Sequence, residues 1–145
     1  LNLYFVLMNG YGWYFWIRGA RDRQIEGKLL VASVPGKELA LAVAAMILGT
    51  LAVGYFFSAY TAADFAYWDS LTTVASFIAM WMTARKYLES WVAWFFIDVL
   101  QIALYVVKGF SGSPGLYFYS FLYTVYLWMA VLGWRSWSQN VVKRV

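Results

Sequence analysis

The chain has 145 residues, of which 63% are apolar and 12% are charged, and its formal net charge is +4. The charged share is about half that of a soluble domain, so we expect lipid rather than one small core to solvate much of the apolar surface. Cysteine and histidine are absent, which excludes disulfides, thiol chemistry and the commonest general base and metal ligand. The basic residues lie between apolar segments and at the tail, a distribution that does not indicate nucleic-acid binding.

Five apolar segments predict an all-α membrane protein. They run approximately over residues 1–17, 39–57, 70–84, 88–107 and 115–134. A span needs about 20 residues, so the first and third segments are short. The third segment also carries the polar residues Thr72, Thr73, Ser76 and Thr83. We therefore expect it to pack against other helices rather than against lipid.

The second segment is rich in alanine and has almost no polar side chain. Its Gly49 and Gly54 permit close approach of a neighbouring helix. These properties predict a linker helix between bundles rather than a helix that carries a functional site.

The charges of the connections predict the orientation of the segments. Basic residues recur in the loop at 18–38, in the turn Arg85–Lys86 and in the tail at 138–145, whereas 58–69 holds only acidic charges. Basic loops remain in the cytoplasm, so the first, third and fifth segments are predicted to run from outside to inside. Lys108 is an exception to this pattern.

Two local charge interactions are expected near the third segment. Glu89 follows Arg85 by four residues, the spacing of an ion pair on a helix surface. Asp69 precedes the third segment and is expected to cap its N-terminus.

A short aromatic phrase closes the first and the last apolar segments. It is G-W-x-x-W, beginning at Gly12 and at Gly133. Because both segments are predicted to run in the same direction, the phrase is compatible with a parallel duplication of a helix bundle, as in transporters that hold substrate between two bundles. A pair of interfacial tryptophan anchors is the alternative interpretation.

The fourth segment carries the side chains best suited to ligand binding. Its residues Trp91, Trp94, Asp98, Gln101 and Tyr105 are spaced by three or four and share one helical face. Asp98 lies about ten residues into the span, near the bilayer midplane. A carboxylate there either faces a ligand cavity or hydrogen-bonds to a neighbouring helix and locks the bundle. The two indoles suit a flat cationic ligand, or else anchor the helix at the interface.

Two further groups of polar residues are ambiguous. Asn9 in the first segment either binds a ligand or bridges helices. The tyrosines of the last segment either line a wet path or form an outer belt, and they are Tyr117, Tyr119, Tyr123 and Tyr126.

An ordered set of motifs resembles the PnuC family of nicotinamide riboside transporters. The set is D-S-L-T-T-V-A-S-F-I-A-M-W-M from Asp69, E-S-W-V-A-W-F-F-I-D-V from Glu89, and the closing G-W-R-S-W. The resemblance implies two parallel three-helix bundles joined by a linker helix, a SWEET-like 3+1+3 arrangement. Residues 1–17 then end the first bundle, 39–57 form the linker and 69–137 form the second bundle. The start at Leu1 without methionine leads us to expect a C-terminal five-helix fragment with two helices missing upstream.

The resemblance also implies positions for substrate binding. The family element Glu-Asn-Trp-x-x-Trp falls on Glu89, Ser90, Trp91 and Trp94, so Trp94 matches and Ser90 departs from the family asparagine. A glutamine common in the family after Ala79 is Met80 here. Both changes remove amide hydrogen bonds, which leaves related vitamins such as thiamine as alternative substrates. The candidate substrate-binding residues are Trp94, Ser90, Trp91, Asp98, Gln101, Asn9, Met80 and Ser76.

The resulting functional hypothesis is facilitated diffusion of nicotinamide riboside or a related vitamin across the bacterial cytoplasmic membrane, with the C-terminus in the cytoplasm. The resemblance implies a cytoplasmic kinase that traps the substrate, and a homo-oligomer is compatible with it. No cofactor or metal is expected. Neither a P-loop nor a paired-carboxylate or Ser/Lys arrangement is present, which argues against ATP coupling and against an enzyme. The alternatives are a thiamine transporter and a structural membrane subunit, and ion coupling through Asp98 stays open.

Overall fold

The computed structural model describes residues 2–19, 21–25, 28–61, 65–110, 112 and 114–141. As the composition predicts, the fold is helical. The helices are α1 (Asn2–Arg18), α2 (Gly36–Tyr60), α3 (Ala66–Ala84), α4 (Ser90–Phe110) and α5 (Tyr117–Ser138), with 3₁₀ turns η1 (Arg21–Arg23) and η2 (Pro114–Leu116). The strands β1 (Gln24–Ile25) and β2 (Lys28–Leu29) form a small antiparallel hairpin. Among the described residues, α2 and α4 are long and apolar enough to cross a membrane.

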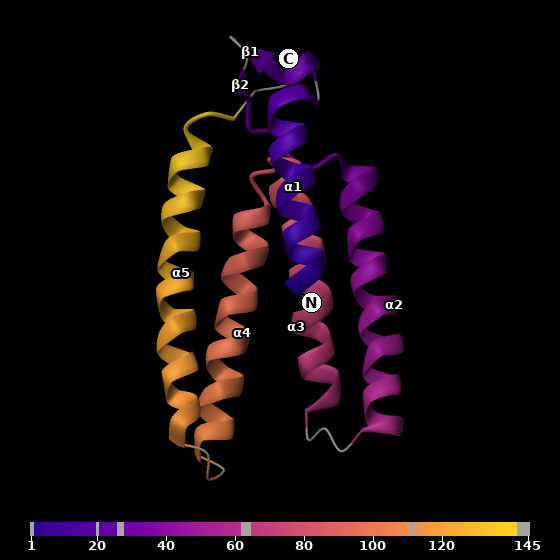
Figure 1. The fold of residues 1–145 in the computed structure, drawn as a ribbon, viewed down its shortest axis with the longest axis vertical. Helices are drawn as coiled ribbons and strands as arrows, with labels where there is room; N and C mark the ends of the chain where they lie inside the picture. Colours follow the sequence, from indigo (N-terminus) through magenta and orange to yellow (C-terminus); the bar gives the residue numbers. More distant parts are fainter. Residues whose placement is uncertain are drawn as a thin grey trace.

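The helices alternate in direction along a common axis (Figure 1). Helices α1, α3 and α5 run one way and α2 and α4 run the other, so the two G-W-x-x-W helices are parallel, as predicted. The hairpin, the α3–α4 turn and the C-terminal end of α5 all lie at one end of the bundle. Because Arg85, Lys86 and Arg135 belong to these elements and Arg23 immediately precedes the hairpin, we call this end the basic end.

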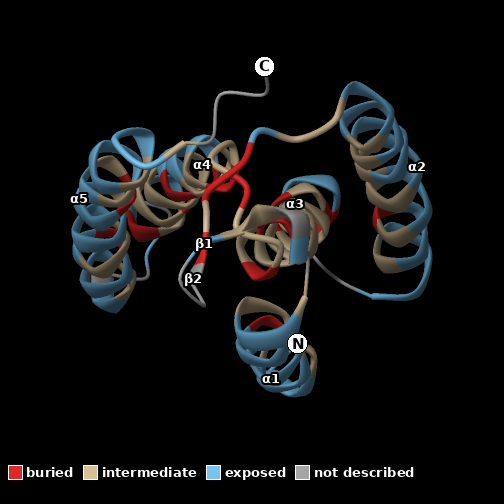
Figure 2. Cartoon of the chain, turned by 90° about the horizontal axis from the view of Figure 1, so that it is seen from above, coloured by how far each residue is buried: buried red, intermediate tan, exposed pale blue. Residues whose placement is uncertain are grey.

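Seen from above, α5, α4, α3 and α2 follow one another and α1 packs on α3 (Figure 2). Small residues permit these close approaches, as the sequence predicts for Gly49 and Gly54. A Cβ atom added to Gly54 would lie 2.3 Å from the ring of Tyr67 on α3, and one added to Gly49 would lie 3.1 Å from Val74. Gly12 plays the same part between α1 and α3, where its added Cβ would lie 3.2 Å from Ala84.

The basic end is closed by the segment that leads into α2. Ala32 pairs with Tyr87 of the α3–α4 turn, and both side chains are buried. Lys86 has a positive φ of 58° and donates from Nζ to the Leu29 carbonyl at 2.6 Å. Burial, and then the charge of Arg23, lower the pKa of Lys86. The segment at 29–32 is therefore tied to the turn between α3 and α4.

Two predicted charge interactions are wrong. Glu89 does not pair with Arg85, because its Oε2 accepts the backbone N–H of Val34 at 3.0 Å, while the Arg85 guanidinium lies 5.5 Å from the Trp81 ring centre. Asp69 does not cap α3, since the helix begins one turn earlier than predicted, after Phe65.

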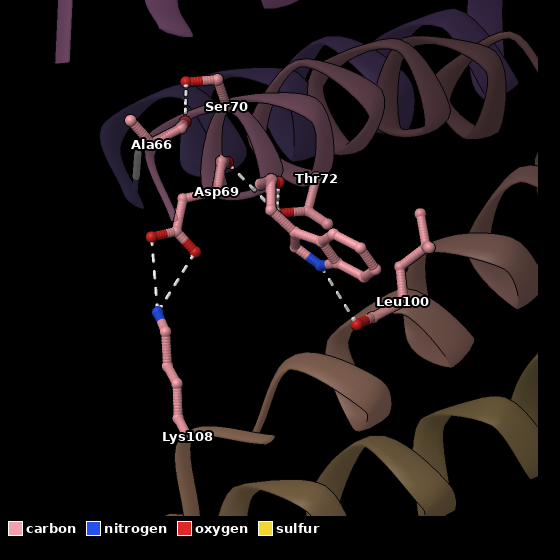
Figure 3. Close-up of polar contacts among 7 residues, drawn as sticks. Ala66, Asp69, Ser70, Thr72, Leu100 and Lys108 are labelled. Carbon is pink, nitrogen blue, oxygen red and sulfur yellow. Dashed lines mark hydrogen bonds and ion pairs between the residues drawn. The ribbon is translucent and has the colours of Figure 1, made fainter. Parts of the chain in front are cut away.

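Asp69 instead forms an ion pair with Lys108 of α4, with a distance of 3.4 Å between Oδ2 and Nζ (Figure 3). The same end of α3 contacts α4 through Trp68, whose Nε1 donates to the Leu100 carbonyl at 3.3 Å. Lys108, the exception in the charge pattern, is thus matched by an acidic partner at the end opposite the basic one.

Candidate functional site

A central cavity of about 360 Å³ lies among α1, α3, α4 and α5. Its size falls in the range of small-molecule sites, about 300–1,000 Å³. Helix α4 contributes the largest share of the lining, with Trp91, Trp94, Ile97, Asp98 and Gln101. The other lining residues are Phe5, Thr72, Thr73, Ser76, Tyr123, Tyr126, Met129 and Ala130.

The predicted face of α4 does line this cavity, apart from its last member. Trp91, Trp94, Asp98 and Gln101 all border it, together with the predicted Ser76 of α3. Tyr105 lies outside the lining and stacks on Tyr119 and Tyr123 of α5, with ring centres 5.3 and 5.6 Å apart. The stack fixes the orientation of Tyr123, which is itself a lining residue.

Three polar groups on the cavity wall have no hydrogen-bond partner among the described residues. Asp98 is only 4% exposed, and no described residue donates a hydrogen bond to it. The Gln101 Oε1 and Trp91 Nε1 atoms are also buried without a partner. Native proteins satisfy nearly all buried polar groups, so these atoms are suited to a bound molecule. The alternative role for Asp98, a hydrogen bond that locks two helices together, has no partner in the described part of the chain.

Trp94 is held in place by a hydrogen bond that crosses from α4 to α3. Its Nε1 donates to Thr83 Oγ1 at 3.0 Å. Thr83 Oγ1 in turn donates to the Ala79 carbonyl one turn earlier, at 2.9 Å. The indole of Trp94 is thus fixed by its polar atom while its ring faces the cavity.

Trp91 owes its place to the second G-W-x-x-W phrase. A Cβ atom on Gly133 would lie 2.5 Å from the indole of Trp91, so only glycine leaves room for that ring. Trp137, the last residue of the phrase, meets Trp91 edge to face at 5.2 Å and also meets Trp16, its counterpart in the first phrase, at 6.0 Å. The two phrases therefore converge on the basic end of the cavity.

Three predicted site residues lie elsewhere. Ser90 is fully buried, and its Oγ donates to the Tyr87 carbonyl at 2.8 Å. Asn9 neither bridges helices nor reaches the central cavity, because its Nδ2 donates to Phe5 in its own helix. Asn9 and Met80 instead line a second cavity of about 220 Å³ between α1 and α3. The expected single set of residues is thus divided between two cavities and one buried position.

The sequence left part of the lining undetected. Tyr123 and Tyr126 were ambiguous between a path and a belt, and both border the cavity. Met129 and Phe5 carried no chemical signal, since apolar residues at helical spacing occur throughout the chain. Among the described residues, no group of three His, Cys, Asp or Glu side chains could hold a metal ion.

Comparisons with known proteins relate this chain to transporters. The protein-family model described as nicotinamide mononucleotide transporter matches residues 1–139. The riboflavin/roseoflavin transporter RibM of Streptomyces davaonensis is 33% identical over 88% of the chain, and the nicotinamide riboside transporter PnuC of Escherichia coli is 26% identical over 99%. The chain spans 57% and 67% of the lengths of these two relatives.

The fold also matches a solved structure. The crystal structure of the vitamin B3 transporter PnuC superimposes with a TM-score of 0.68 at 21% identity, over 93% of this chain and 58% of the other. At this identity the match establishes the fold alone.

Proposed function

The chain belongs to the nicotinamide mononucleotide transporter family, and we propose that the protein imports an unphosphorylated vitamin through the central cavity by facilitated diffusion. The proposed substrate is nicotinamide riboside or a related vitamin made of a flat aromatic ring and a polyol. The observation that carries the proposal is the set of unpartnered polar groups beside two indoles on one face of α4.

The cavity wall offers complementary contacts for each part of such a molecule. The Trp91 and Trp94 rings suit stacking with a flat aromatic ring. The Asp98 carboxylate and Gln101 Oε1 can accept hydrogen bonds from hydroxyl groups, and Trp91 Nε1 can donate one. These three groups would regain in the complex the hydrogen bonds that they lack in the free protein.

The charge of the wall argues against a phosphorylated substrate. Among the described residues, the lining includes the Asp98 carboxylate and neither lysine nor arginine. A phosphate would lie beside a like charge in a medium of low dielectric constant, without a cation to neutralise it. We therefore expect the nucleoside rather than the mononucleotide to be bound.

Two vitamins are favoured by different observations. Nicotinamide riboside carries a cationic ring, which the indoles and the Asp98 carboxylate would attract. Riboflavin, an uncharged molecule with a larger ring, is favoured by the higher identity to RibM. Thiamine is also cationic and aromatic, so it remains a further competitor to test.

The route is proposed to lead from the outside to the basic end of the bundle. Basic segments remain in the cytoplasm, which would place the C-terminus there. Helices α3, α4 and α5 would form the second bundle of a 3+1+3 arrangement, with α2 as its linker and α1 as the last helix of the first bundle. A second bundle, from the same protein or from another copy, would complete the site, and a cytoplasmic kinase would trap the substrate after release.

Counterflow in proteoliposomes tests the proposal. The protein encoded by the complete gene is reconstituted without ATP or ion gradients, and exchange of labelled nicotinamide riboside is measured against unlabelled riboside, riboflavin, thiamine and nicotinamide mononucleotide. We expect exchange, with competition by unphosphorylated vitamins and none by the mononucleotide. Exchange that appears only with a proton gradient, and is independent of the gradient in Asp98→Asn, would replace facilitated diffusion by coupled transport. Absence of exchange under every condition would refute the proposed function.

A further inference from the structure

We propose that Thr83 holds Trp94 as a partition between the central cavity and the second cavity, and that substrate passes through the second cavity on its way to the basic end. This inference rests on the proposed transport function and assigns a positioning role to Thr83 and an on-path site to the second cavity. The residues of the second cavity that carry the argument are Asn9, Trp16, Met80 and Thr83.

One hydrogen-bonded pair borders both cavities. Trp94 lines the central cavity, Thr83 lines the second, and the 3.0 Å bond from Nε1 to Oγ1 joins them. The separation of the two spaces therefore depends on where the Trp94 indole is held. A rotation of this one side chain, after loss of a single neutral hydrogen bond, would remove the barrier.

The two cavities also follow one another along the bundle. On α1, Phe5 lines the central cavity and Met8, Asn9 and Gly12 line the second, a spacing that keeps all four on one helical face. On α3 the lining moves from Thr72–Ser76 to Met80–Ala84, a shift of about 12 Å toward the basic end at 1.5 Å per residue. A continuous route of this kind is what release toward the cytoplasm requires.

The part of the second cavity nearest the basic end is bordered by an indole. Trp16 lines it, donates from Nε1 to the Ala84 carbonyl at 3.0 Å and lies 4.9 Å below Lys86 Nζ. The second cavity thus has Trp16 on the side of the basic end and Thr83, which holds Trp94, on the side of the central cavity. This arrangement suits a chamber that is entered from one side and left from the other.

The first test removes the hydrogen bond while keeping the shape of the side chain. In proteoliposomes, Thr83→Val should raise the maximal exchange rate about fivefold, because a typical neutral hydrogen bond no longer holds the partition closed, with little change in KM. Thr124→Val is the matched control, since Thr124 is exposed on α5 and bonds only to its own helix through the Ser120 carbonyl. A Thr83→Val rate equal to or below that of the control would overturn the partition.

A double-mutant cycle separates a latch from a general structural effect. Trp94→Phe removes the same donor, so Thr83→Val should have no further effect on the maximal rate in the Trp94→Phe background. An unchanged effect of Thr83→Val in that background would show that Thr83 acts through something other than Trp94, and would overturn the assignment. Loss of exchange in the unmodified protein would instead refute the proposed function.

The second test uses the absence of cysteine from these 145 residues. Met80→Cys, or Met8→Cys if the first variant does not fold, introduces a thiol into the second cavity, and Thr124→Cys introduces one outside it. Substrate should slow thiol modification at the cavity position and not at the control, and adding Thr83→Val should accelerate it. Modification that is insensitive to substrate, in a protein that still exchanges substrate, would remove the second cavity from the path.

Discussion

Helices α2 and α4 have nearly the same hydropathy and different roles. Both are apolar enough to cross a membrane. The middle of α2 has no charged side chain, whereas α4 carries the buried Asp98 near its middle. Helix α2 contacts α3 through Gly49 and Gly54, while α4 lines the central cavity with five residues. Hydropathy therefore identifies a candidate span, and the periodic polar residues within it identify the helix that lines most of the central cavity.

The strongest test of this difference places the same carboxylate in α2. Leu48 lies at the centre of α2 and is 68% exposed in the bundle, so we expect it to face lipid. Leu48→Asp should disfavour membrane insertion by about 3 kcal/mol, the apparent value for a carboxylate at a helix centre. A glycosylation-based insertion assay of α2, with Leu48→Ala as the control, measures this effect. Normal insertion of the aspartate variant would contradict the expected cost of a carboxylate at the centre of α2.

A second change acts on α4 through its neighbour α5. Gly133→Val would place a side chain within the volume of the Trp91 indole and should destabilise the protein by about 2 kcal/mol through overpacking. Thermal unfolding in detergent gives the stability, and vitamin binding by the surviving folded protein should also weaken because Trp91 must move. Gly115→Val is the control, since its added Cβ would meet nothing within 4 Å. Equal unfolding temperatures for the two variants would contradict the packing argument.

Most of the fold follows from patterns that depend on local sequence. Apolar length and the Gly49 and Gly54 approaches predict features that the structure contains. The wrong predictions share a cause, because each assigned a charged residue to its nearest partner in sequence. Glu89 bonds to Val34, 55 positions away, and Asp69 pairs with Lys108, 39 positions away. Such partners are set by tertiary packing, which spacing within one helix does not encode.

Of the candidate site, the sequence predicts mainly the residues that share one face of α4. The α4 stripe from Trp91 to Gln101 is found from a period of 3.6 residues. Ser90 lies one position off that stripe and is buried, although the motif resemblance placed it in the site. Asn9 and Met80 are on the expected helices but lie about one turn closer to the basic end than Phe5 and Ser76, in the second cavity. Depth along neighbouring helices depends on how far each is shifted relative to the next, and the sequence does not state that shift.

Trp94→Ala tests the stacking contribution of α4. We expect substrate binding to weaken by about 1–2 kcal/mol, equivalent to about 5- to 30-fold in Kd, through loss of a desolvated aromatic contact. Isothermal titration calorimetry of the protein encoded by the complete gene with nicotinamide riboside measures the change. Trp134→Ala serves as a control, since Trp134 lies outside the central cavity. Equal affinities of the folded Trp94→Ala variant and the unmodified protein would move Trp94 to the class of interfacial anchors.

The smallest effect on stability is expected for the partly exposed ion pair between Asp69 of α3 and Lys108 of α4. The side chains of Asp69 and Lys108 are 41% and 28% exposed. Asp98, on the same helix as Lys108, is buried. Water and salt screen such a pair, so Asp69→Asn should lower the free energy of unfolding by less than about 1 kcal/mol. The difference in thermal unfolding between Asp69→Asn and the unmodified protein should shrink further in 1 M salt, and Asp69→Asn combined with Lys108→Met should be no less stable than Lys108→Met alone. A larger loss that persists in high salt would mean that the pair is shielded from water in the membrane. The end of the bundle opposite the basic one would then be held as firmly as the basic end.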